Sequence, residues 1–151
     1  MTTIELTKGA QGRYETPGVG WLKQKSMLSN DFVGEAVDLG PLTFTRNWTG
    51  RTYEVTDNLP RVRGNHNRAG WGNSGPLEWD DVQYEFATHS AWRSSFVLRR
   101  HTEDLATFTP KRFGRTIEIQ ILDNAHVPTG LLLFGAWITI MSQRDAAAAA
   151  G

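Results

Sequence analysis

Residues 115–141 read RTIEIQILDNAHVPTGLLLFGAWITIM, and this stretch decides the expected fold. Its first part alternates, with Ile117, Ile119 and Ile121 on one face and polar side chains between them. Its second part, 131–141, is apolar almost throughout, and a segment rich in turn formers separates the two. Period two beside a continuous apolar run predicts a half-buried strand that returns as a fully buried one. We expect the pair to form the core of a sheet and to carry no chemistry.

The composition of the whole chain agrees with a β protein of one domain. Its 151 residues are 11% aromatic and include 15 Gly, which favours strands and turns over helices. Sixteen basic residues balance sixteen acidic ones, so no global charge favours nucleic acid or an acidic membrane. Because the sequence has no Cys, disulfides, thiol catalysis and zinc–thiolate sites are excluded.

Taken in order, the chain divides into an arm, a β domain and a tail. Residues 1–30 are punctuated by Gly and Pro and are expected to form an extended N-terminal arm or loop. Residues 31–144 are the β domain, and within it 31–39 fits either a bulged strand or a short helical turn. Residues 42–55 predict a β-hairpin with Gly50 in its turn. Residues 145–151 form a low-complexity Ala tail.

Two further segments complete the expected architecture. Residues 56–81 are rich in Gly, Asn, Pro and Ser and have no apolar period, which predicts a long functional or partner-ordered loop. Residues 101–108 resemble one short helix with Thr102 as its N-cap. The predicted class is all-β: an antiparallel sandwich, jelly roll or partly closed barrel with long polar loops and at most one short helix.

No segment predicts secretion or a membrane span. The N-terminus lacks a basic region followed by an apolar one, so we expect synthesis in the cytosol without a signal peptide. The apolar run near the C-terminus is about half of the ~20 residues that a spanning helix needs.

Catalytic and metal-binding patterns are not found in the sequence. The four His residues are scattered, and no carboxylate stands at a characteristic ligand spacing from them. We therefore expect no enzyme activity, no metal and no cofactor.

Charge is arranged in alternating blocks. A basic block, Arg61, Arg63 and Arg68, precedes an acidic one that includes Asp80 and Asp81. Arginine outnumbers lysine, and arginine is the cation enriched at interfaces. One interpretation is that the blocks dock between copies of the same protein; the other is ordinary surface charge.

Tryptophans flank the predicted loop. Trp71 and Trp79 lie in or beside it, and Trp48 lies beside the hairpin turn, whereas Trp21, Trp92 and Trp137 are expected in the core. Exposed Trp beside polar side chains is typical of sugar-binding sites and of protein interfaces. Stacking on single-stranded nucleic acid is less favoured because the net charge is zero.

These patterns favour a non-catalytic, self-assembling structural protein, with a virion component such as a bacteriophage capsid, penton or tail protein as the leading hypothesis. Its partners would be copies of itself and other virion proteins. The alternative is a carbohydrate-binding β-sandwich that uses loop tryptophans. The candidate contact residues are Arg61, Arg63, His66, Arg68, Trp71, Trp79, Asp80, Asp81 and Trp48.

Overall fold

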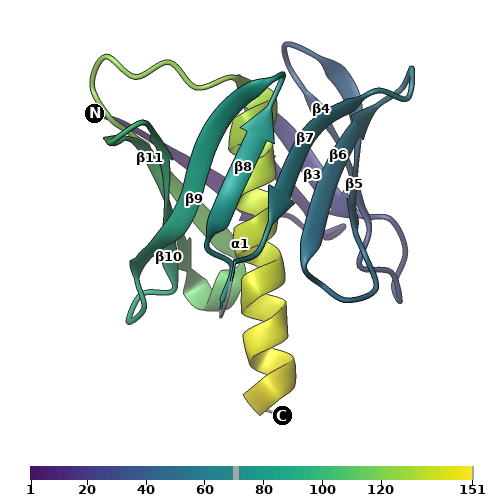
Figure 1. The fold of residues 1–151 in the computed structure, drawn as a ribbon. Helices are drawn as coiled ribbons and strands as arrows, with labels where there is room; N and C mark the ends of the chain where they lie inside the picture. The colour runs from purple at the N-terminus through teal and green to yellow at the C-terminus, as the bar shows by residue number, and fades with distance from the viewer. Residues whose placement is uncertain (70–71, 151) are drawn as a thin grey trace.

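The computed structural model describes residues 1–69 and 72–150, and within them twelve antiparallel strands close into a barrel around one helix (Figure 1). Each strand pairs with its neighbours in sequence, and β1 pairs with β12 to close the barrel. The strands are β1 (Thr2–Lys8), β2 (Arg13–Thr16), β3 (Gly20–Gln24), β4 (Phe32–Ala36), β5 (Gly40–Arg46), β6 (Thr52–Asp57), β7 (Val62–Asn67), β8 (Gly75–Trp79), β9 (Val82–Ser90), β10 (Ser95–Arg100), β11 (Glu103–Lys111) and β12 (Thr116–Ile121). A 3₁₀ turn, η1 (Arg112–Gly114), precedes β12, and the helix is α1 (Thr129–Ala150).

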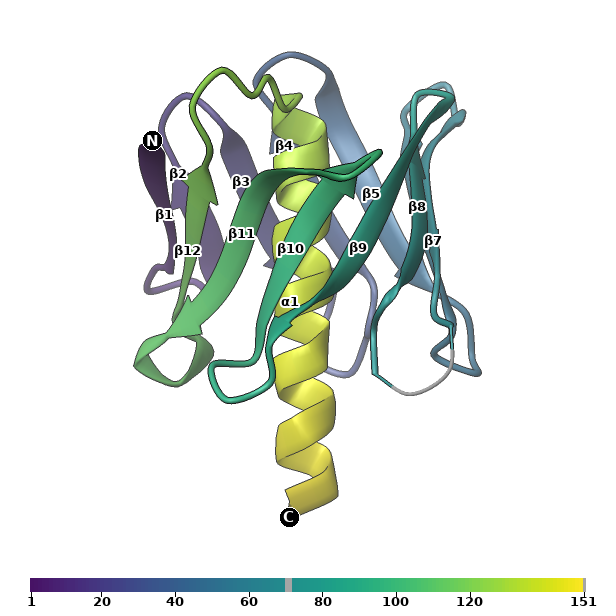
Figure 2. The same ribbon diagram turned by 60° about the vertical axis from the view of Figure 1, so that its left-hand side comes forward.

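The barrel has two distinct ends, which we name after the helix. At the entry end, α1 enters the barrel and the N-terminus lies close by (Figure 2). The entry end consists of connections 17–19, 37–39, 58–61, 80–81, 101–102 and 122–128. At the exit end, the C-terminal part of α1 emerges. The exit end consists of connections 9–12, 25–31, 47–51, 68–69, 72–74, 91–94 and 112–115 and the helix beyond Met141.

The alternating residues 116–121 form strand β12. Ile117 and Ile119 are fully buried inside the barrel, while Glu118 and Gln120 point toward its outer face. Ile119 lies opposite Ile4 of β1 and Phe108 of β11 in the antiparallel register. The prediction of a half-buried strand is therefore confirmed, since its period of two matches a wall with one wet face.

The prediction that 131–141 forms a strand is wrong, because these residues are the buried part of α1. All residues from Gly130 to Met141 are buried, so the helix is apolar around its whole circumference. A twelve-strand barrel has an interior too wide for its own inward side chains to fill. The helix fills this space, so it belongs to the core although it is the one α-helix among the described residues.

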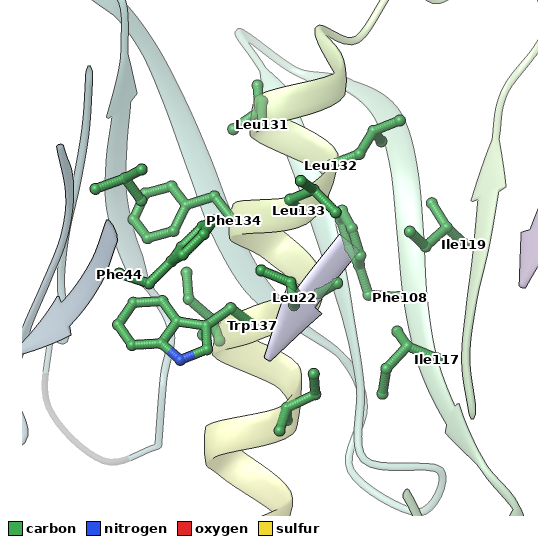
Figure 3. Packing of buried hydrophobic residues seen from close by; sticks show 14 of the residues in the cluster. Leu22, Phe44, Phe108, Ile117, Ile119, Leu131, Leu132, Leu133, Phe134 and Trp137 are labelled. Carbon is green, nitrogen blue, oxygen red and sulfur yellow. The ribbon is translucent and has the colours of Figure 1, made fainter. Parts of the chain in front are cut away.

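Aromatic side chains form one side of the contact between helix and wall (Figure 3). Trp137 lies 5.5 Å from Phe44 and 5.4 Å from Tyr53, measured between ring centroids. Phe108, Ile117 and Ile119 lie on the other side of the helix. The all-β prediction is confirmed, and of the architectures left open the barrel is correct, though it is fully closed.

The segment 56–81, expected to be one long loop, holds strands β7 and β8. Its inward positions on β7 are Gly64 and His66, which explains why no apolar period is visible. A Cβ on Gly64 would lie 2.6 Å from the Trp79 ring, so the indole fills the space that a larger side chain would need.

Two other expectations change. Residues 1–30, expected to be an arm, hold β1, β2 and β3 of the wall. The helix expected over 101–108 is a two-residue turn followed by β11, whose Ala106 and Phe108 face inward at strand spacing. The Ala tail continues α1 to Ala150. The hairpin over 42–55 is confirmed as β5 and β6, and 32–36 is the strand β4.

Candidate functional site

The predicted basic block does not present free charge at the entry end. Nε of Arg61 lies 3.1 Å from Oδ2 of Asp57, and Nε of Arg63 lies 2.7 Å from Oδ1 of Asp80. Arg68 lies at the opposite end, where its guanidinium donates to the carbonyls of Gly50 and Gly72. The three arginines therefore lie at two different ends of the barrel, and contact with a partner stays a prediction for each of them.

Asp57 organises the turn between β6 and β7. Its Oδ1 accepts hydrogen bonds from the backbone N–H groups of Arg61 at 2.8 Å and Leu59 at 2.9 Å. These donors, together with the Arg61 guanidinium, lower the pKa of Asp57 to about 2. Arg61 and Arg63 thus stabilise this end of the barrel through ion pairs. Arg61 pairs with Asp57, and Arg63 pairs with Asp57 and Asp80.

Two other candidate residues are buried. Trp79 is 1% exposed and packs on α1, so it is not available to stack on a sugar. His66 is fully buried, with Nδ1 2.9 Å from the Pro76 carbonyl oxygen and Nε2 2.7 Å from that of Asn73. Burial lowers the pKa of His66, and the two carbonyls offset part of this effect. Both residues belong to the core because β7 and β8 are strands of the wall.

Of the predicted surface tryptophans, Trp48 is 95% exposed, and Trp71 lies outside the described residues. Trp48 borders a small cavity of ≈ 280 Å³ whose other lining side chains include Asn47, Arg68 and Asp145. Trp92, expected in the core, is 94% exposed in the β9–β10 turn, while Trp137 is buried as expected. Asp80 and Asp81 are exposed and make the two-residue β8–β9 turn, both with positive φ.

Charge is polarised along the barrel axis although the net charge is zero. The connections of the exit end carry six basic side chains and one Asp: Lys25, Arg51, Arg68, Arg93, Arg112, Arg115 and Asp31. The connections of the entry end carry four Asp and one Arg: Asp38, Asp80, Asp81, Asp123 and Arg61. One end of the barrel is therefore basic and the other acidic.

Exposed large apolar side chains are confined to the same two ends. In the described part of the chain, those at the exit end are Met27, Leu28, Trp48, Trp92 and Phe113, and those at the entry end are Met1, Val37, Leu59 and Val62. Large exposed apolar side chains gathered in one place mark interaction surfaces. Apart from Val62, the first residue of β7 beside the entry end, the described strands carry none on the outer wall, so both ends qualify as candidate contact surfaces.

Strained backbone occurs at both ends of the barrel, and at the exit end it lies in the β11–β12 turn. Arg112 and Phe113 have φ of 53° and 59°, and the Phe113 side chain is fully exposed. A bulky residue with positive φ is an outlier, and such outliers concentrate at functional positions.

A cavity of ≈ 940 Å³ also opens at the exit end. It lies between the emerging part of α1, η1 and the β1–β2 and β3–β4 connections, and its cations are Lys8, Lys23, Lys25, Arg115 and Arg144. No sequence pattern predicts this group, because its residues come from four separate segments with no shared motif.

No group of three or more His, Asp or Glu that could hold a metal ion is found among residues 1–69 and 72–150. In the same residues, no helix is long and apolar enough to cross a membrane. Comparison of the chain with protein-family models, with curated proteins and with solved structures finds no match.

Proposed function

We propose that this is a non-catalytic structural protein whose copies associate end to end, the basic exit end of one copy on the acidic entry end of the next. The observation that carries the proposal is the coincidence, at the two ends only, of opposite charge and exposed apolar side chains. Apolar contact supplies affinity, and complementary charge orients the two partners and excludes like ends.

An entry-on-exit contact joins two different surfaces, so each added copy leaves one free end of each kind. Such heterologous contacts build rings when the rotation closes and filaments when it does not. Repetition of identical contacts is also how virion shells and tails are built. We therefore place the proposed function in a virion, as a capsid, penton or tail component, with copies of this chain as the first partner.

Sedimentation velocity over a range of protein concentration tests self-association directly. We expect larger species at about 0.01 M salt and fewer of them at about 1 M salt, because the Debye length falls from about 30 Å to about 3 Å over this range. Electron microscopy of the low-salt sample is expected to show rings or filaments. A monomer at every concentration and salt would refute the proposal.

Charge reversal separates end-to-end association from other modes. The exit-end variant is Arg51→Glu/Arg93→Glu/Lys111→Glu, in which Lys111 is the last residue of β11 before the exit-end turn. The entry-end variant is Glu35→Lys/Glu103→Lys/Asp123→Lys, in which Glu35 and Glu103 lie at the ends of β4 and β11 beside the entry end. None of the six side chains is buried. Each variant alone is expected to remain monomeric. Mixing the two is expected to restore association with the two variants alternating. The unchanged entry end of the first variant matches the unchanged exit end of the second, and the two reversed ends match each other. Failure of the mixture to associate would contradict the entry-on-exit geometry.

Carbohydrate binding stays a second candidate because Trp48 is exposed beside the polar ≈ 280 Å³ cavity. A ring stacked on Trp48 would place its hydroxyls near Asn47 and Arg68, which is the usual design of a sugar site. A glycan array followed by titration of the Trp48→Ala variant tests this candidate. A hit that survives this substitution would place the sugar elsewhere.

A further inference from the structure

The ≈ 940 Å³ cavity at the exit end concentrates positive charge that the protein itself does not neutralise. Its five cations are Lys8, Lys23, Lys25, Arg115 and Arg144, and no carboxylate is among the described residues that line it. None of the five forms an ion pair with a described carboxylate. This differs from the entry end, where Arg61 and Arg63 pair with Asp57 and Asp80.

The floor of the cavity is apolar and well packed. Tyr14, Phe32 and Ile140 line it and are 6%, 2% and 4% exposed. The cations stand directly beside this floor: Nζ of Lys8 lies 5.9 Å from the centroid of the Tyr14 ring, and Cζ of Arg144 lies 5.8 Å from that of Phe32. Tyr14 is held in place by a hydrogen bond from its hydroxyl to the Gly114 carbonyl at 3.0 Å.

We propose that this cavity binds a small amphiphilic anion, with a carboxylate or phosphate head group against the lysines and arginines and an apolar body on Tyr14, Phe32 and Ile140. An inorganic anion would use the charge but make no apolar contact, whereas an uncharged apolar ligand would leave the cations unpaired. The volume is within the ~300–1,000 Å³ of small-molecule sites, so one such ligand fits. The whole cavity lies within one copy, but it opens at the exit end, so an end-to-end contact would compete with the ligand. Binding is therefore measured at a protein concentration at which sedimentation shows a monomer.

Dodecyl phosphate and laurate, below the concentration at which they form micelles, are suitable probes for isothermal titration calorimetry at low salt. We expect saturable binding of one molecule per chain. Inorganic phosphate is expected to bind at least about tenfold more weakly, since it leaves the apolar contact unmade. Dodecyltrimethylammonium, which has the same chain and the opposite charge, is expected not to bind.

Lys8→Gln/Arg144→Gln removes two of the five cations, and we expect it to weaken dodecyl phosphate binding by about tenfold or more, because charge-assisted contacts are the strong ones. Arg51→Gln/Arg93→Gln is the matched control, since it removes two exit-end charges outside the cavity. Circular dichroism checks that both variants keep the fold.

Several results would overturn the inference: no binding of either anionic probe, more than one molecule per chain, equal weakening in the control, or equal affinity for the cationic probe. Binding to anionic vesicles without binding of the free amphiphile would also overturn it, since the exit end would then contact a lipid surface and not a single molecule. Loss of self-association in the charge-reversed variants would leave this test unaffected.

Discussion

A Cβ atom placed on Gly135 of α1 would lie 2.4 Å from Cζ of Phe108 on β11. Both residues lie deep inside the barrel, and the Phe108 ring also packs on Phe86 at 5.6 Å between centroids. Gly130 repeats this relationship with Trp79, whose Cζ2 would lie 2.5 Å from an added Cβ. At Gly130 and Gly135, the absence of a side chain therefore lets an aromatic ring of the wall approach the helix backbone.

We expect Gly135→Ala to lower the free energy of unfolding by about 1–3 kcal/mol, because overpacking a filled core forces rings and backbone apart. Helix propensity alone predicts the opposite sign, a gain of about 1 kcal/mol. Urea denaturation measures the change. Gly9→Ala is the control, since its added Cβ would lie 3.6 Å from the nearest atom, the Arg13 carbonyl oxygen. A Gly135→Ala variant more stable than the wild type would show that Phe108 shifts without cost.

Asp57 is expected to make the fold sensitive to acid. Its folded pKa of about 2 is below the ordinary value of 3.8, so its ionised form favours the folded state. This contribution is complete above about pH 4 and is lost as the pH falls toward about 2. We expect Asp57→Asn to be less stable than the wild type at pH 7 and to lose less stability across that window. Asp81→Asn in the neighbouring turn controls for removal of one carboxylate; an equal effect of both would contradict the assignment to the Asp57 turn.

His66 is expected to add a second pH dependence at higher pH. Burial holds its folded pKa below the ordinary 6.5, so the unfolded chain binds the proton more tightly than the folded barrel. Stability is therefore full above about pH 6.5 and falls as the pH drops below it, by at most about 1.4 kcal/mol per pH unit. Thermal unfolding between pH 8 and pH 5 measures this slope, and His66→Gln is expected to flatten it whatever its absolute stability. An unchanged slope would assign the dependence to other groups.

The exposed aromatics of the exit end are expected to contribute to association and not to folding. In the Trp48→Ser/Trp92→Ser variant, two side chains that are 95% and 94% exposed in the folded protein are removed. We expect the free energy of unfolding to change by no more than about 0.5 kcal/mol, as is usual for surface substitutions. Self-association by sedimentation is expected to weaken at both low and high salt. Unaltered association would restrict the proposed contact to its charged residues.

Part of this architecture follows from local sequence patterns. Ile117 and Ile119 alternate with polar residues, and only a strand at the wall of a core satisfies that period. The hairpin of β5 and β6 is likewise local. Period alone does not distinguish strand from helix in 131–141, because a segment apolar on every side satisfies both. The helix forms because the closed barrel leaves a lumen that a strand would not fill.

The tertiary structure alone decided the nature of the candidate site. Gly64 and His66 look like loop residues in sequence, yet they occupy the inward positions of β7, where the Trp79 ring fills the space beside Gly64. Arg61 and Arg68 lie at opposite ends of the barrel because β7, which runs between the two ends, separates them. The reverse holds for Lys8 and Arg144, which are far apart in the chain and line one cavity because the barrel closes around α1. Local periodicity determined which face of a strand is buried, whereas closure of the barrel determined which distant charges meet.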